Sequence, residues 1–285
     1  MTMAAVAAAP GFRLRRRSAV PGFSVTLGVT LTVLSLVVLI PLSAVVLRSA
    51  GLGPAGFLQA ALSERALAAY RLSFGAALLG ASINGVFGLL TAWALVRYEF
   101  PLKGLVNAIV DLPFALPTAV AGIALAALYA DGGWIGAVLA QAGIKLAYNP
   151  AGVVVALTFV GLPFVVRTVE PVLRDLSRDV EEAAASLGAD RWQTLARIIW
   201  PALAPAWLTG FALAFARAVG EYGSVIFISS NLPFESEIAP LLIIIQLEQY
   251  DYGAAAAVAT VMLAASFAML FLINGVQAWA RRFEA

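Results

Sequence analysis

Two ionisable residues lie inside an otherwise apolar stretch of the sequence, residues 210–229. Arg217 and Glu221 are four positions apart, so a helix would place them on one face and let them form an ion pair. Charged groups within a membrane usually face a bundle interior or a water-filled cavity. The pair therefore predicts either a structural bridge or the lining of a transport pathway. In a pathway, the planar donors of Arg217 would suit a passing oxyanion, and Gly220 and Gly223 would leave backbone approachable beside it.

Other kinds of chemistry are excluded by what the sequence lacks. It contains no Cys and no His, which excludes disulfides, thiolate chemistry, zinc sites built on these residues and imidazole-dependent catalytic dyads. It also has no Gly-x-x-x-x-Gly-Lys-Ser/Thr phosphate loop. We therefore expect no enzyme activity, no catalytic residues, no metal and no cofactor bound by this chain. An intramembrane enzyme that uses Asp111 and Glu221 is an alternative, but no recognised catalytic spacing joins these two residues.

A charged stretch, EEAAASLGADRWQTLARIIWP at residues 181–201, interrupts the apolar sequence. Asp179 can cap a helix in which Glu182 reaches back as in a capping box. Gly188 can end that helix in a left-handed conformation. Asp190 and Gln193 offer a second capping pair before Pro201. The stretch therefore predicts a helix, a glycine turn and a second helix.

The first of these helices has a face of small and apolar residues. This face is formed by Val180, Ala183, Ala184 and Leu187. A helix resting on lipid headgroups would need bulky apolar residues opposite Lys or Arg. Acidic residues instead disfavour an anionic membrane surface. The pattern favours docking to a cytoplasmic protein over docking to lipid.

The surrounding sequence has the composition of a multi-pass membrane protein. The chain has 285 residues, of which 62% are hydrophobic and 12% are charged, with a net charge of +2. A membrane-spanning helix needs roughly 20 mostly apolar residues. Six blocks meet this requirement, so we predict an all-α membrane protein with six transmembrane helices. These blocks are residues 23–47, 68–96, 104–129, 149–168, 202–229 and 253–279.

Several features within and between these blocks predict irregular structure. Pro113, Pro117 and Gly122 should loosen span three, and Pro163 interrupts span four after Gly161. Pro and Gly are also simply common in membrane helices. Two apolar segments, residues 134–148 and 238–250, are short for a span. They are predicted to be surface or re-entrant helices, or loop wrapped on the bundle.

The distribution of basic residues predicts the orientation in the membrane. Cytoplasmic loops carry an excess of Lys and Arg. One side holds Arg13, Arg15, Arg16, Arg17, Arg97, Lys103, Arg167, Arg174, Arg178, Arg191, Arg197, Arg281 and Arg282. The other side holds Arg48, Arg65, Arg71 and Lys145. Both termini are therefore predicted to be cytoplasmic, with the acidic 231–252 loop outside and the charged stretch between spans four and five inside.

The charged stretch resembles the EAA loop of permease subunits from bacterial ABC importers. That pattern is Glu-Ala-Ala, three residues, Gly, nine residues, then Ile-x-Leu-Pro. Its residues here are Glu182, Ala183, Ala184, Gly188, Ile198 and Pro201. Trp200 stands where Leu is usual. The resemblance implies that the loop forms a coupling helix, which sits in a cleft of a separate ATP-hydrolysing subunit.

Five longer stretches resemble one branch of that family, the T-type permeases of sulfate/thiosulfate importers. The stretches are residues 70–101, 111–130, 161–176, 210–229 and 236–252. The resemblance implies a type I ABC importer permease fold in a bacterial cytoplasmic membrane. It also implies a second related permease, two copies of a cytoplasmic ATPase that uses ATP and Mg, and a periplasmic sulfate/thiosulfate-binding protein. Membrane lipid is the remaining partner, and no nucleic acid is expected.

The predicted organisation has one membrane domain and short flanking segments. Residues 1–22 form a cytoplasmic tail, and residues 23–65 form the first span and an outer loop. Residues 66–280 form the ABC transmembrane type-1 domain, with the coupling loop at about 177–200, and residues 281–285 form the C-terminal tail.

Two other transport functions remain open. A permease for molybdate, tungstate or another oxyanion would share this chemistry. A gradient-driven secondary transporter could use Arg217, Glu221 and Asp111 as ion or proton sites, although the EAA spacing argues against it.

Overall fold

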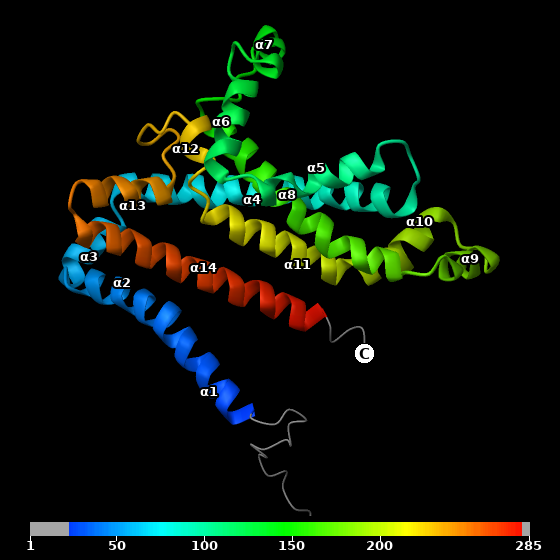
Figure 1. Cartoon of the computed structure of the whole chain (residues 1–285), viewed down its shortest axis with the longest axis horizontal. Helices are drawn as coiled ribbons and strands as arrows, with labels where there is room; N and C mark the ends of the chain where they lie inside the picture. Colours follow the sequence, from blue (N-terminus) through cyan, green and yellow to red (C-terminus); the bar gives the residue numbers. More distant parts are fainter. Residues whose placement is uncertain (1–22, 281–285) are drawn as a thin grey trace, which may run out of the picture. The chain divides into compact units, whose positions relative to one another are not determined.

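The computed structural model of the chain describes residues 23–280, which exclude the two predicted tails at 1–22 and 281–285 (Figure 1). Within this part every regular element is a helix, which confirms the predicted all-α fold. The chain divides into two compact units, Met1–Ala44 and Val45–Ala285.

The first unit contains most of the first predicted span. Helix α1 covers Phe23–Leu34, a π-helical turn covers Ser35–Leu39, and α2 covers Ile40–Ala50 and runs into the second unit. Together they give one long apolar run, Val25–Ala50. A run of this length and composition is suited to cross a membrane.

Three long helices form the core of the second unit. They are α4 (Glu64–Arg97), α8 (Pro150–Asp175) and α11 (Trp200–Val219), and each packs against the other two. Glycines bring them close: a Cβ at Gly80 would touch Leu157, and one at Gly88 would press on Val165. Small residues at helix contacts allow this close approach in membrane bundles.

The third predicted span is broken into two helices. Helix α5 covers Lys103–Ala115 and α6 covers Thr118–Tyr129, with an angle of 119° between them. Leu116 at the break is extended, as expected for a residue that precedes a proline. Pro113, by contrast, lies within α5. The predicted loosening of this span is confirmed, and it is concentrated at Pro117.

The fifth predicted span ends earlier than the sequence suggested. Helix α10 (Arg191–Thr194), a π-helical turn (Leu195–Ile199) and α11 form one apolar run, Arg191–Val219. The predicted helical end at residue 229 is wrong, because α11 stops before Gly220 and a short helix, α12 (Val225–Ile228), follows separately.

The breaks in spans three and five pack against each other. A Cβ added at Gly122 in α6 would collide with the backbone of Ser224, and one at Gly223 would collide with Thr118. Gly223 is therefore covered by α6 instead of being open beside Arg217, whereas a Cβ at Gly220 would meet nothing. The two interruptions form one close contact in the interior.

The remaining helices of the second unit are α3 (Gly53–Ala61), α7 (Trp134–Gln141), α9 (Arg178–Ser186), α13 (Ala239–Glu248) and α14 (Tyr252–Ala280). The two short apolar segments do form short helices, α7 and α13. Among the described residues, five helices are long and apolar enough to span a membrane, and the bent α5–α6 pair makes six. This agrees with the predicted number of spans.

Candidate functional site

The helix–glycine–helix loop lies at one end of the second unit, where Figure 1 shows α9 and α10 side by side. Helix α9 begins after Ser177, whose Oγ accepts a hydrogen bond of 3.2 Å from the Asp179 backbone N–H. The predicted cap at Asp179 is therefore wrong, and Glu182 makes no capping bond. In the described part of the chain, the exposed Glu182 carboxylate has no hydrogen-bond or ionic partner.

The glycine turn is formed as predicted. Gly188 has a φ of 86°, and its N–H donates to the Ala185 carbonyl. The next N–H, of Ala189, donates to the Ala184 carbonyl at 3.0 Å. This pair of bonds is a Schellman motif, which satisfies carbonyls left free at a helix C-terminus. A side chain at residue 188 would be strained by this backbone conformation.

The second helix begins with the predicted capping pair. The Gln193 N–H donates to Asp190 Oδ1 at 2.8 Å, and the Asp190 N–H donates to Gln193 Oε1 at 3.1 Å. Ile198 lies in the following π-helical turn, and Pro201 lies in the first turn of α11. Because Arg191–Val219 is one continuous helical run, Pro201 is inside it and does not mark its start.

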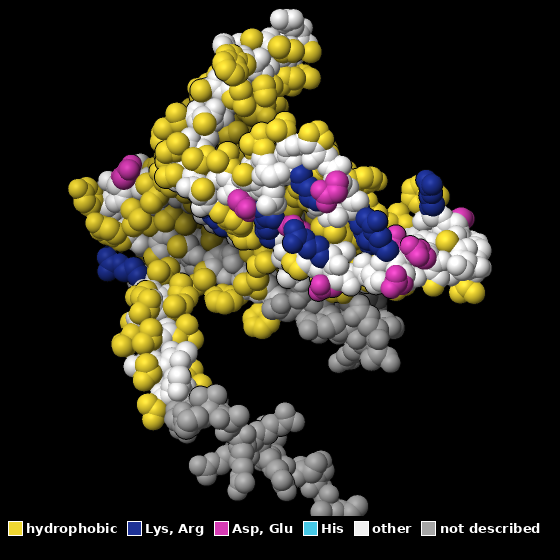
Figure 2. Space-filling model, turned by 45° about the vertical axis from the view of Figure 1, so that its right-hand side comes forward, with side chains coloured by type: hydrophobic (Ala, Val, Ile, Leu, Met, Phe, Trp, Pro, Cys, Tyr) yellow, Lys and Arg dark blue, Asp and Glu magenta, His cyan; other side chains and the backbone are white. Residues whose placement is uncertain are grey.

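The outer surface of the loop exposes large apolar side chains. Leu187 is 90% exposed, Trp192 is 78% exposed and Val180 is 44% exposed. Of the predicted small-residue face, Ala184 is turned inward and Ala183 is exposed. Figure 2 shows charged side chains of both signs gathered around this end of the molecule. Exposed apolar groups rimmed by charges are typical of a protein contact surface.

The predicted intramembrane pair is also formed. Arg217 Nη1 lies 2.5 Å from Glu221 Oε2, and the Glu221 side chain is only 2% exposed. Its other oxygen, Oε1, accepts hydrogen bonds from the Ser224 N–H at 2.9 Å and the Ser224 hydroxyl at 3.0 Å. Glu221 thus holds the segment after α11 in place. Arg217 is 36% exposed at its side chain and keeps N–H donors that are not used by Glu221.

A second charged cluster was missed by the sequence reasoning. Arg167 on α8 donates to Asp111 Oδ1 and Oδ2 at 2.8 and 2.6 Å, and to the Asn107 side chain at 2.9 Å. Arg167 Nη1 also lies 2.5 Å from Glu170 Oε2 in an ion pair, and Glu170 forms a second ion pair with Arg174. The cluster fixes α5 on α8. Only the helical spacing of Arg167, Glu170 and Arg174 could have indicated it, because Asp111 is far away in sequence.

The sequence reasoning also missed an ion pair at the start of α4, because its two residues are far apart in the sequence. Arg65 Nε and Nη2 donate to the two carboxylate oxygens of Glu237 at 2.8 and 2.6 Å. The Glu237 side chain is 1% exposed. This bidentate pair ties the segment before α13 to the start of α4.

Together, the broken spans, the small-residue core and the exposed loop define a multi-pass membrane permease. Residues 84–284 match the family described as "Binding-protein-dependent transport system inner membrane component", and the chain belongs to this family. The predicted boundaries of 66–280 for the membrane domain stay a prediction.

Three relatives illustrate the similarity. The "Sulfate transport system permease protein CysT" of Synechocystis sp. is 48% identical over 274 residues, which are 96% of each chain. The protein of that name from Escherichia coli is 46% identical, covering 93% of this chain and 96% of the relative. The "Probable sulfate transport system permease protein cysT" of Nephroselmis olivacea is 50% identical over 89% of each chain.

Solved structures have the same fold at low sequence identity. A chain of a bacterial ABC transporter involved in alginate import has a TM-score of 0.73 and 15% identity, with 90% of this chain and 94% of that chain covered. A chain of the MetNI methionine ABC transporter has a TM-score of 0.53 and 16% identity, covering 76% and 99%. The predicted type I ABC importer permease fold is confirmed.

Proposed function

We propose that this chain is a permease subunit of an ATP-driven importer that moves sulfate, and thiosulfate as well, across the cytoplasmic membrane of a bacterium. The observation that carries the proposal is 46–48% identity to two bacterial CysT sulfate permeases over 93–96% of this chain. The substrate is proposed on this similarity, because Arg217 is suited to any oxyanion.

Coupling to ATP would occur through the loop at 177–200, with α9 as the coupling helix. The exposed Leu187 and Trp192 side chains, the free Glu182 carboxylate and Ala183 support docking of a separate ATPase there. Gly188 shapes the turn between α9 and α10. Ile198 and Pro201 lie where the second helix of the loop continues into α11. ATP and Mg would be bound by the ATPase, since the sequence has no phosphate loop.

The assembly would contain this chain, a second related permease, two copies of the ATPase and a periplasmic binding protein. Exposed apolar residues on α4, including Leu78, Leu79, Val86 and Phe87, support burial against lipid and a second permease. With the α9 end in the cytoplasm, both termini would also be cytoplasmic. The residues around Glu237 would then face the binding protein.

The role of the Arg217–Glu221 pair would be to shape the pathway. Glu221 is used fully within the protein, so it supports the backbone beside Arg217 instead of binding substrate. Arg217 keeps free donors and partial exposure, which supports a transient contact with a passing anion. A contact that is weak enough to release the anion is what transport requires.

Uptake of labelled sulfate in cells that contain the whole transporter tests the function. We expect uptake only with an active ATPase subunit, with inhibition by thiosulfate and little inhibition by molybdate. Uptake without the ATPase would indicate a gradient-driven carrier. Strong competition by molybdate would move the substrate to molybdate or tungstate.

The coupling role of the loop is tested at Gly188. Gly188→Val should strain the left-handed turn and reduce ATP-dependent uptake by about tenfold, because Val rarely adopts a positive φ. Gly188→Asn is the matched control, since Asn tolerates this conformation and should retain most uptake. Equal uptake by the two variants would contradict the proposed coupling loop.

A further inference from the structure

Helix α9 is held by an element that is distant from it in sequence. Along the chain it follows α8 and precedes α10, but its side-chain ion pair is with α4. Arg97, the last residue of α4, places Nη2 2.5 Å from Glu181 Oε1 on α9. Arg178, the first residue of α9, donates to the Arg97 carbonyl at 3.4 Å. The end of α4 therefore holds the first turn of α9 through both side chain and backbone.

The Arg97 side of this ion pair is shielded from water. The Arg97 side chain is 11% exposed and the Glu181 side chain is 31% exposed. The Arg97 guanidinium carbon lies 5.7 Å from the centre of the Trp93 ring, one turn earlier on α4. A cation placed against an indole and shielded from water interacts more strongly with its carboxylate than an exposed cation does.

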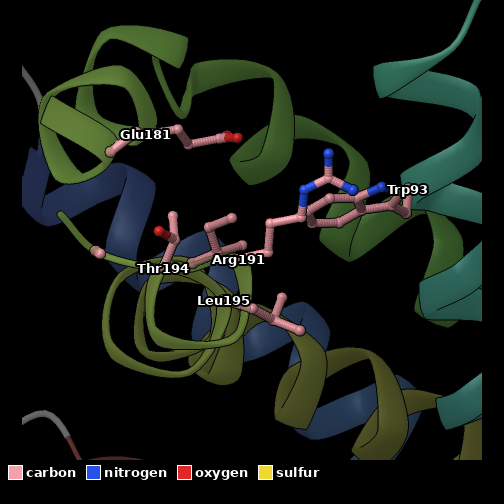
Figure 3. A pocket seen from close by; sticks show the side chains of 8 residues that line it. Trp93, Glu181, Arg191, Thr194 and Leu195 are labelled. Atoms are coloured by element: carbon pink, nitrogen blue, oxygen red, sulfur yellow. The ribbon is translucent and has the colours of Figure 1, made fainter.

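Beside this ion pair lies a hollow of about 400 Å³, bordered by α9, by α10 with the π-helical turn that follows it, and on the α4 side by Trp93. Its lining includes Trp93 from α4, Glu181 and Ala185 from α9, and Arg191 from α10. Figure 3 shows the Glu181 and Arg191 side chains extending into it, with Trp93 on the far wall. Helices α4 and α9 do not pack extensively against each other. Their direct connection therefore depends on the Arg97–Glu181 pair and on the bond from Arg178 to the Arg97 carbonyl.

Helix α4 can transmit a movement over the whole thickness of a membrane. It is a continuous helix of 34 residues, Glu64–Arg97, which corresponds to about 51 Å. At its other end, Arg65 holds Glu237 in a bidentate ion pair. Spans three and five, by contrast, are interrupted near their contact. Among these three spans, α4 is the one that joins both ends of the unit without a break.

We propose that Arg97 is a positioning residue for coupling: through Glu181 it fixes α9 on the end of α4, so that displacement of α9 by the ATPase moves α4 directly. This inference rests on the proposed function of α9 as the coupling helix. It adds a second route for the displacement, beside the chain connections from α9 to α8 and α10. Glu182, the neighbouring carboxylate, stays free for the ATPase.

The test uses the complete transporter in vesicles and compares Arg97→Gln, Glu181→Gln and the double variant. The quantities measured are the amount of co-purified ATPase, sulfate uptake, and the number of ATP molecules hydrolysed per sulfate transported. We expect assembled complexes in which each single variant raises the ATP-to-sulfate ratio by about threefold to tenfold. The double variant should be no worse than either single one, because both remove the same interaction.

Two further variants serve as controls. Arg97→Lys keeps a charge that can reach Glu181 and should restore most of the coupling. Lys103→Ala removes the nearby ion pair with Glu99, whose side chain is 89% exposed, and should leave the ratio unchanged. If Arg97→Gln fails to assemble, Glu181→Gln decides, because its partly exposed side chain tolerates the change.

The outcomes separate this inference from the proposed function. A normal ATP-to-sulfate ratio in assembled Glu181→Gln overturns the inference and leaves the function intact. A parallel loss of assembly, uptake and ATP hydrolysis at an unchanged ratio also overturns it, since that is the effect of a purely structural residue. If the unmodified transporter shows no ATPase-dependent uptake, the proposed function itself fails.

Discussion

Helix α4 and the α5–α6 pair both have the length to cross a membrane, but only the pair is broken. Helix α4 contains Gly80, Gly85 and Gly88 and no proline, and it continues for 34 residues. The pair bends by 119° beside Pro117. Proline alone does not explain the difference, since α8 continues through Pro163 and Pro171. The break occurs where a second interrupted span, at Gly223 and Ser224, packs against the start of α6.

The difference shows that glycine has two roles in this bundle. In α4 it allows helices to pack side by side: a Cβ at Gly80 would only reach contact distance, 3.3 Å, from Leu157 and Thr158, and one at Gly88 would press on the Val165 side chain. In α6, Gly122 faces the backbone of Ser224, which cannot rotate away. A backbone contact of this kind leaves less freedom for substitution than a side-chain contact does.

The largest effect is expected at Gly122. Gly122→Ala should destabilise the protein by about 3 kcal/mol, because the new methyl group overlaps the Ser224 backbone. Gly75→Ala in α4 is the matched control, since a Cβ there meets nothing, and it should stabilise by up to about 1 kcal/mol. Thermal unfolding of the purified transporter measures both. Equal midpoints for the two variants would disprove the close contact between the breaks.

The next effect concerns the buried carboxylate beside the break in span five. Glu221→Ala should destabilise by about 2–3 kcal/mol, because it leaves Arg217 unpaired and removes the acceptor for Ser224. Glu221→Gln keeps an acceptor for the Ser224 N–H and should lose about 1 kcal/mol less. Thermal unfolding separates the two losses. If both variants unfold at the same temperature, the hydrogen bonds to Ser224 do not stabilise this segment.

The charged cluster on α8 should have a smaller effect. Arg167→Ala removes the contacts that fix α5 and should destabilise by about 1–2 kcal/mol, because it also leaves Asp111 without its partner. Faster proteolysis in the 98–102 connection, compared with the unmodified protein, would report the loosened α5. An unchanged cleavage rate would mean that α5 is held mainly by apolar packing.

The smallest effect is expected at the surface ion pair between Lys103, the first residue of α5, and Glu99 in the connection before it. Lys103→Ala removes an ion pair of 2.8 Å with Glu99 and should cost about 0.3 kcal/mol. The loss should disappear at high salt, because exposed charges are screened. A loss as large as that of Arg167→Ala would contradict the distinction between exposed and shielded ion pairs.

Features with a local cause were predictable from the sequence. The apolar blocks set the number of spans, and the left-handed turn at Gly188 and the capping box at Asp190 and Gln193 depend on residues a few positions apart. Arg217 and Glu221 were recognised for the same reason. The cap of α9 was placed wrongly because Ser177 and Asp179 are both good N-cap residues. In the structure α9 begins after Ser177, and its residues Arg178 and Glu181 both contact Arg97 at the end of α4.

Features that depend on distant partners were not predictable. Arg167 and Asp111 are 56 positions apart, and Arg65 and Glu237 are 172 apart. Periodicity within one segment carries no information on such pairs. The early end of span five has the same origin, because its continuation is packed on Thr118 in another span.

The segment between α12 and α13 is irregular, but it is tightly held. Ser236 is fully buried, the Ser229 hydroxyl donates to its carbonyl at 2.9 Å, and the Ala239 N–H donates to Ser73 Oγ at 2.8 Å. Leu232 and Phe234 remain exposed on this support. A partner that contacts these two side chains would meet a surface that is already ordered. Binding there would lose little conformational entropy, so even a small contact area could give a specific complex.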